Sequence, residues 1–352
     1  MFTASVTQDD FQRQLQSMIL SSMVFAVLAR NQVPRLIENS TLIAETKNWF
    51  GVTAYCADYH WLDAEKILYM TEGERQTMVF HTYNIVTKRT ADNALSAAYK
   101  QSDGSFDSIE VSPDGKKVFW SGRTGKQSKW FVADCDGKNV GSFDRRKTSV
   151  IISNHGPDDE TTLTWGPDGK SVYESIVEFG NGTSTSLWYR SIPPLDREQK
   201  LPTAKGYVDF QPRILPGNIA FATSGLAMGG ERKSAGFITW NVNNPGRTRR
   251  EWTVTVPKNR TISMFSHSHD GNRILWDLTV HDPKNPDQWA GVAEDFFLTD
   301  ATGKGWQIVA NLPFDKNNSG EQRSKMSGPQ WTIDDKALSY VYMGKLYLFK
   351  LP

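Results

Sequence analysis

A short apolar strand, a tight turn and a second apolar strand recur along most of this chain. Three copies of the pattern are close to one another: residues 111–120 (VSPDGKKVFW), 165–173 (WGPDGKSVY) and 267–276 (HSHDGNRILW). In each copy the central Asp-Gly pair accepts turn geometry, and the apolar residues on both sides favour extended backbone. The pattern therefore predicts antiparallel hairpins, with no extended helix between residues 41 and 352.

Three more divergent copies extend the pattern into a repeat. They are residues 61–69 (WLDAEKILY), 331–340 (WTIDDKALSY) and 210–221 (FQPRILPGNIAF), so that the first residues of the six copies are 61, 111, 165, 210, 267 and 331. The second unit adds a third strand at 129–134, with turn residues on both sides. Four strands in each unit of about 50 residues are typical of a propeller blade. We therefore predict an all-β fold, a six-bladed β-propeller of four-stranded antiparallel blades.

The last unit is short, because only three strands fit after residue 331. A strand at 41–45 (TLIAE) is expected to complete this blade beside 345–350 (KLYLFK), because closing the ring removes exposed sheet edges. The chain then divides into an N-terminal helical or signal-like segment, 1–40, and a propeller, 41–352.

The second unit also carries the residues of a known repeat. The run SPDGKKVFWSGRTG at 112–125, followed by WFVAD at 130–134 and an Asp-Gly at 136–137, resembles the TolB-type, WD-repeat-like propeller repeat. The resemblance covers residues 50–352, with close matches in three of the six units. It implies a six-bladed propeller of a kind that is often exported.

The N-terminal segment contains the longest apolar run, residues 18–29 (MILSSMVFAVLA). Twelve residues are too few for a membrane-spanning helix, which takes about 20, so we predict no integral membrane span. The run fits the apolar core of a signal peptide, which predicts a periplasmic or secreted protein. The alternative is an amphipathic anchoring helix that begins near Thr7 and Asp10, in a chain that stays cytoplasmic.

Charge argues against nucleic acid as a partner, and the tryptophan content has to be explained either by packing or by binding. Lys plus Arg number 40 and Asp plus Glu 39, and a net charge of +1 gives no basic field for nucleic acid. The 12 Trp exceed the 11 Tyr, but ten of them fall at recurring blade positions, where packing between blades explains them. Trp49 and Trp289 alone lie outside these positions. The predicted strand residues are Trp61, Trp120, Trp130, Trp165, Trp188, Trp240, Trp252, Trp276, Trp306 and Trp331.

His267 and His269 have the only metal-like spacing in the chain. Residues i and i+2 on a strand point to the same side, so both imidazoles could meet one divalent ion. Two ligands are too few for a complete site. The alternative is structural, because His267 replaces the Trp and His269 replaces the Pro of the repeat.

Further candidates lie in predicted loops at the mouth of the central channel, away from the Asp-Gly turns. This ligand face would contain His155, His281, Trp289, Arg123 and Arg232. Exposed loop residues without any role are the alternative interpretation for each of them.

Motifs of nucleophilic and nucleotide chemistry are missing from the sequence. It has no Gly-x-Ser-x-Gly, no Walker-type loop and no Gly-x-Gly-x-x-Gly, so we predict neither catalytic residues nor a cofactor. The leading hypothesis is an exported, non-catalytic, monomeric TolB-like propeller that binds a protein or carbohydrate partner on one face. The alternative is a carbohydrate-active propeller enzyme, such as a metal-dependent oligogalacturonate (uronate) lyase with its metal at His267 and His269.

Overall fold

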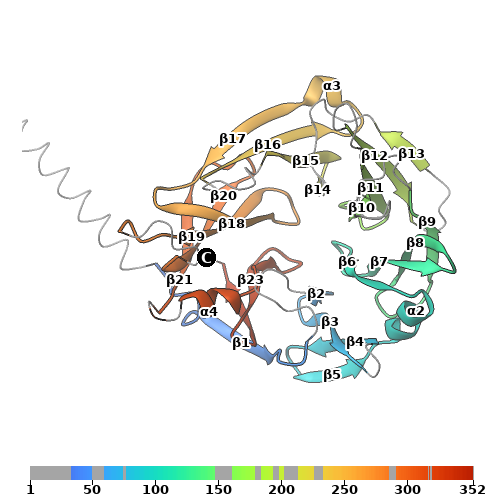
Figure 1. Cartoon of the computed structure of the whole chain (residues 1–352), viewed down its shortest axis with the longest axis horizontal. Coiled ribbons are helices and arrows are strands. Elements are labelled where there is room, and N and C mark those ends of the chain that lie inside the picture. Colours follow the sequence, from blue (N-terminus) through green and yellow to red (C-terminus); the bar gives the residue numbers. More distant parts are fainter. Residues whose placement is uncertain are drawn as a thin grey trace, which may run out of the picture.

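Six four-stranded antiparallel sheets surround a central axis, as the repeat predicts (Figure 1). The structure is a computed structural model, and it describes residues 33–49, 59–73, 77–146, 161–178, 184–192, 198–201, 213–225, 233–284, 291–315, 317 and 319–351. The predicted six-bladed β-propeller is confirmed. The proposed N-terminal helix or signal segment lies almost entirely outside the described residues.

The first five blades are each built from four strands that follow one another along the chain. Blades 1 and 2 contain β2 (Tyr59–Trp61), β3 (Lys66–Glu72), β4 (Met78–Asn84), β5 (Arg89–Asp92), β6 (Ser105–Val111), β7 (Lys117–Thr124), β8 (Gln127–Asp134) and β9 (Gly141–Asp144). Blade 3 contains β10 (Thr161–Trp165), β11 (Ser171–Glu178), β12 (Ser184–Ser191) and β13 (Glu198–Leu201). Blades 4 and 5 contain β14 (Arg213–Leu215), β15 (Ile219–Gly225), β16 (Ser234–Asn241), β17 (Arg250–Thr255), β18 (Arg260–His267), β19 (Arg273–Val280), β20 (Ala293–Asp300) and β21 (Gln307–Pro313).

The sixth blade is assembled from both ends of the propeller. Strands β22 (Gln330–Trp331), β23 (Ala337–Tyr342) and β24 (Lys345–Lys350) are joined by β1 (Ser40–Glu45), which pairs antiparallel with β24. Thr41 lies opposite Leu348, and the hydroxyl of Tyr340 donates to Ser40 Oγ over 2.9 Å. The predicted closure is therefore confirmed, and it pairs an edge strand that would otherwise be exposed.

The hydrophobic core lies between the blades, in six buried clusters that each join neighbouring sheets. The indoles of Trp61, Trp165 and Trp331 are almost fully buried in these layers. Each indole also donates a hydrogen bond to the blade before it: Trp165 Nε1 lies 3.1 Å from the carbonyl oxygen of Glu110, for example. The recurring Trp thus connect adjacent blades by packing and by hydrogen bonding.

The turn after the first strand explains why the repeat needs its glycine. Gly115 has φ of +70°, and a Cβ at this position would lie 1.8 Å from the carbonyl oxygen of Leu62 in the neighbouring blade. Asp114 Oδ1 accepts the hydroxyl of Ser112 over 2.7 Å within the same turn. The Asp-Gly pair therefore closes the hairpin and lets two blades approach each other.

Three short helices were not predicted, although no extended helix is present among the described residues, and one Trp lies off its predicted strand. Short helices interrupt the strands at α2 (Leu95–Gln101), α3 (Pro245–Thr248) and α4 (Ser319–Ser324). They are too short to give an extended helical period, and α2 contributes Leu95 and Tyr99 to a core between blades. Trp306 stands just before β21 and not within it, although its ring packs against Trp276 with centroids 5.1 Å apart.

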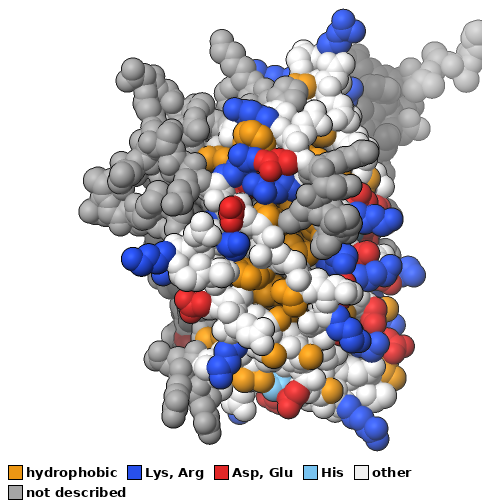
Figure 2. Space-filling model, turned by 90° about the vertical axis from the view of Figure 1, so that its right-hand side faces the viewer, with side chains coloured by type: hydrophobic (Ala, Val, Ile, Leu, Met, Phe, Trp, Pro, Cys, Tyr) orange, Lys and Arg blue, Asp and Glu red, His pale blue; other side chains and the backbone are white. Residues whose placement is uncertain are grey.

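The outer surface shows no predominance of one charge on the side drawn in Figure 2, where Lys and Arg are mixed with Asp and Glu among the described residues. This agrees with the near-zero net charge of the chain. None of the helices in the described part of the chain is both long and apolar enough to cross a membrane.

Candidate functional site

A cavity of about 410 Å³ opens in the central channel, at the end that carries the Asp-Gly turns. The first strands of blades 1, 2, 4, 5 and 6 form its wall together with the residues just beside them. Its lining residues are His60, Trp61, Glu110, Val111, Ser112, Arg213, Met264, Phe265, Ser266, His267, His269, Gly328, Pro329, Gln330, Trp331 and Ile333.

Strand alternation determines which side chains face this cavity. In three innermost strands the first residue of the repeat copy, here called the anchor residue, is buried between blades. The residue just before each anchor is half-buried and polar. These preceding residues are His60, Ser266 and Gln330, and Glu110 has the same place before Val111. The residues that precede the buried anchors therefore give the channel a polar wall.

Glu110 brings a carboxyl group into the cavity from β6. Its backbone is fixed by the indole of Trp165, and no side chain in the described part of the chain is seen to donate a hydrogen bond to the carboxyl group. Burial raises the pKa of this carboxyl to about 7, and the positive charge of Arg213 opposes part of that rise. Glu110 can therefore exchange a proton near neutral pH.

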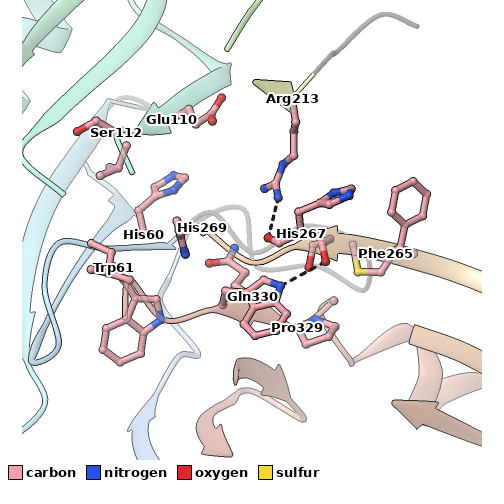
Figure 3. A pocket seen from close by; sticks show the side chains of 16 residues that line it. His60, Trp61, Glu110, Ser112, Arg213, Phe265, His267, His269, Pro329 and Gln330 are labelled. Carbon is pink, nitrogen blue, oxygen red and sulfur yellow. Dashed lines mark hydrogen bonds between the residues drawn. The ribbon is translucent and has the colours of Figure 1, made fainter. Parts of the chain in front are cut away.

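Arg213 extends into the same space from β14 in blade 4 (Figure 3). Its Nη1 donates to the carbonyl oxygen of His267 over 2.9 Å, which orients the guanidinium, and the residue remains exposed to the channel. The repeat placed an anchor of this blade at Phe210, which lies outside the described residues. Arg213 itself was not predicted to have a role.

His60 completes the polar wall from β2. Its Nε2 is buried, and no hydrogen-bond partner for it is found among the described residues. Burial lowers the pKa of His60 to about 4, so the imidazole is neutral at physiological pH. The ring therefore adds a hydrogen-bonding group to the cavity without adding charge.

The two histidines of the predicted metal site are held in different ways. The ring of His267 is buried against Phe221 of blade 4, with centroids 4.0 Å apart, whereas His269 Nδ1 lies 2.8 Å from Asp335 Oδ1. Burial, and then the charge of Arg213, lower the pKa of His267 to about 3. These are the contacts expected of the structural alternative for His267.

A divalent ion at His267 and His269 stays a prediction. Among the residues that the structure describes, no group of three or more His, Cys, Asp or Glu side chains could hold a metal ion. The rings of His267 and His269 also face different neighbours. No third ligand for this pair is therefore found among the described residues.

The predicted ligand face lies at the other end of the channel, where the second and third strands meet. His281 follows β19 there as expected, and its Nε2 is 2.8 Å from Thr261 Oγ1. Arg123 is exposed near the end of β7. His155, Trp289 and Arg232 lie outside the described residues, so their placement stays a prediction. Trp49 is packed, since its ring stacks on Tyr69 with centroids 4.1 Å apart.

Sequence reasoning did not identify Glu110, Arg213 or Gln330. A signal for two of them was present, because Glu110 and Gln330 immediately precede anchor positions of the repeat, where alternation turns a side chain towards the axis. Arg213 lies in the most divergent copy, and its place could not be read in this way.

Comparison with known proteins found similar solved structures but no matching family. Profiles of protein families gave no match, and no curated protein matched. Similar solved structures include a TolB-type protein from Agrobacterium tumefaciens (13% identity, TM-score 0.49, covering 91% of this chain and 97% of that one). TolB from Acinetobacter baumannii (14%, 0.44, 89% and 72%) and an oligogalacturonate lyase in complex with manganese (11%, 0.45, 87% and 90%) are also similar. At such identities the likeness concerns the fold alone, and the six-bladed propeller rests on the sheet topology of this chain itself.

Proposed function

We propose that this protein is an exported, non-catalytic propeller that binds a segment of a protein partner at the mouth of its central channel. The observation that carries the proposal is the cavity of about 410 Å³ between the first strands of five blades. Its volume is in the range of ligand sites, and its wall combines apolar side chains with a few polar groups that converge. A propeller alone implies no function, so the proposal depends on this site.

The burial of the tryptophans at the cavity favours a protein segment over a carbohydrate as the ligand. Trp61 and Trp331 border the cavity but are each only 5% exposed, and Trp331 also lies beneath the guanidinium of Arg273. A sugar ring stacks on an open aromatic face, which these two indoles lack. The cavity offers hydrogen-bonding groups instead, and these suit the backbone and polar side chains of a peptide.

Export is supported by the apolar run at residues 18–29, which has the length of a signal-peptide core. This segment lies outside the described residues. The uronate-lyase alternative keeps one supporting observation, because Glu110 titrates near neutral pH as a proton-transferring group would.

A photo-crosslinking residue in place of Gln330 tests the proposal in cells that produce the protein. Gln330 lines the cavity, so we expect one discrete protein adduct, found outside the cytoplasm on a chain that lacks residues 1–29. The matched control places the same residue at Arg250, which is exposed on β17, the outermost strand of blade 4. Equal adducts at both positions, or none at position 330, would contradict the proposal.

A further inference from the structure

We propose that the channel cavity binds a carboxylate of the partner segment through Arg213, and that it binds this group more tightly in acid because Glu110 faces the same space. This inference rests on the proposed function and names the chemistry that the site recognises. It concerns a free C-terminus or an Asp or Glu side chain, which share the same charged group.

Arg213 supplies the positive charge. Among the lining residues that the structure describes, it is the one Lys or Arg. His60 and His267 are uncharged at neutral pH, since burial lowers their pKa values to about 4 and about 3. A negatively charged group that enters this cavity therefore finds its counter-charge on Arg213.

The guanidinium is already oriented for such a group. Its hydrogen bond to the carbonyl oxygen of His267, 2.9 Å long, uses one of five N–H donors and ties the side chain to blade 5. The charges of Glu110 and Asp335 act on it, but no carboxylate among the described residues is found within ion-pair distance of it. Because an arginine fork matches a carboxylate with two parallel hydrogen bonds, a ligand carboxylate is the partner that best completes the site.

Glu110 lies across the cavity and makes the recognition depend on pH. The groups around it are the guanidinium of Arg213 from β14, the neutral imidazole of His60 from β2, and His267 and His269 beside β18, the latter paired with Asp335. Arg213 is thus the strongest charge that acts on Glu110. When protonated, the Glu110 carboxyl can donate to a ligand carboxylate, and when ionised it repels one.

The sign of the effect follows from linkage. A bound carboxylate favours the protonated form of Glu110, so binding takes up a proton and affinity falls as pH rises through about 7. A ligand carboxyl is already ionised throughout this range, because its ordinary pKa is about 4. Ionisation of the ligand therefore contributes nothing to the pH dependence, and the Glu110→Gln variant assigns it.

Calorimetric titration of the whole protein with matched peptides tests the inference. One pair is acetyl-tetra-alanine with a free C-terminal carboxylate and its amide; the other is acetyl-Ala-Ala-Glu-Ala-amide and its Gln twin. The two pairs distinguish the two sources of the carboxylate. We expect one acid to bind about tenfold more tightly than its neutral twin at pH 6, and the advantage to shrink several-fold at pH 8.

Variants assign the effect to the two residues. Arg213→Gln should remove the preference for the acid, and Glu110→Gln should keep the preference but remove its pH dependence. Arg89→Gln is the matched control, because Arg89 is an exposed cation on the outer strand β5 and should change neither. Thermal unfolding of each variant verifies that it is folded.

Several results would overturn the inference. One is equal binding of each acid and its neutral twin; another is that no peptide binds at millimolar concentration. Either result overturns the inference alone, because the proposed function is tested separately by crosslinking at position 330. Digalacturonate that binds through Arg213 when the peptides do not would assign the site to acidic sugars. An unsaturated product absorbing in the ultraviolet would then make the protein a lyase.

Discussion

Two glutamates of the propeller, Glu174 and Glu110, show how differently one fold can treat a carboxylate. Glu174 on β11 is completely buried and accepts hydrogen bonds from Trp130 Nε1, from the backbone N–H of Arg146 and from Arg190 Nη2, at 3.0 to 3.1 Å. The charge is surrounded by donors from neighbouring strands. Such a charge holds blades 2 and 3 together and has no capacity left for a ligand.

Glu110 is treated in the opposite way. It is half-buried at a cavity, no donor to its carboxyl group is seen among the described residues, and Arg213 acts on it from across the channel. Because nothing stabilises the ionised form fully, its pKa rises to about 7. The comparison teaches that a satisfied buried charge is architectural, whereas an unsatisfied charge at a cavity is available to bind.

The largest expected effect comes from breaking the satisfied network. Glu174→Ala should lower the free energy of unfolding by about 3–5 kcal/mol, because it removes the buried carboxylate shared by Arg146 and Arg190 and leaves buried Arg190 only the longer, 3.7 Å contact with Glu198 among the described carboxylates. Urea denaturation followed by fluorescence measures this. The control is Glu251→Ala on an exposed pair with Arg249, which should change stability by no more than about 0.5 kcal/mol. Equal losses in the two variants would remove the distinction drawn here.

Removing the charge of Glu110 should have a smaller effect of opposite sign. Between the ordinary pKa of about 4.5 and the folded value of about 7, the native state holds a proton that the unfolded chain has lost, so wild-type stability falls as pH rises. Glu110→Gln should therefore be more stable than wild type by about 1–3 kcal/mol at pH 8. The difference should vanish near pH 4, where both states are protonated. Denaturant titrations across this range measure it, and a pH-independent difference would contradict the assignment.

The smallest effect is expected at Arg213. Arg213→Gln should lower the free energy of unfolding by less than about 1 kcal/mol, because the side chain is exposed to the channel and makes one hydrogen bond to a carbonyl oxygen. Arg190→Gln, at a buried ion pair with Glu174, is the matched comparison and should cost several times more. Similar losses in parallel denaturation curves would mean that Arg213 is structural.

The repeat allowed the architecture to be predicted because its signals are local. An Asp-Gly pair closes a hairpin through its own backbone geometry, and alternation buries Trp61, Trp165 and Trp331 wherever sheets are stacked. Closure followed from counting strands, since the last unit lacked one and 41–45 supplied it. None of these inferences required knowledge of which blades are neighbours across the channel.

The predicted metal pair shows what a local rule leaves open. His267 and His269 would point together on one strand, but β18 ends at His267, and His269 is held by Asp335 of the next blade. The side chain of His267 is enclosed by Phe221 of the previous blade. Each of the two side chains thus contacts a different neighbouring blade, which the sequence spacing alone does not reveal.

By itself, then, the sequence determined the strands, their turns, the number of blades and the strand that closes the ring, because all of these depend on short-range pattern and count. Only the tertiary structure brought Glu110 and Arg213 to one cavity from blades 2 and 4, although they are 103 residues apart. The tertiary structure alone decided that the Glu110 carboxyl has few hydrogen-bond partners and titrates near neutral pH. Burial and opposing charge are set by what the ring places across the channel, and no local pattern carries that information.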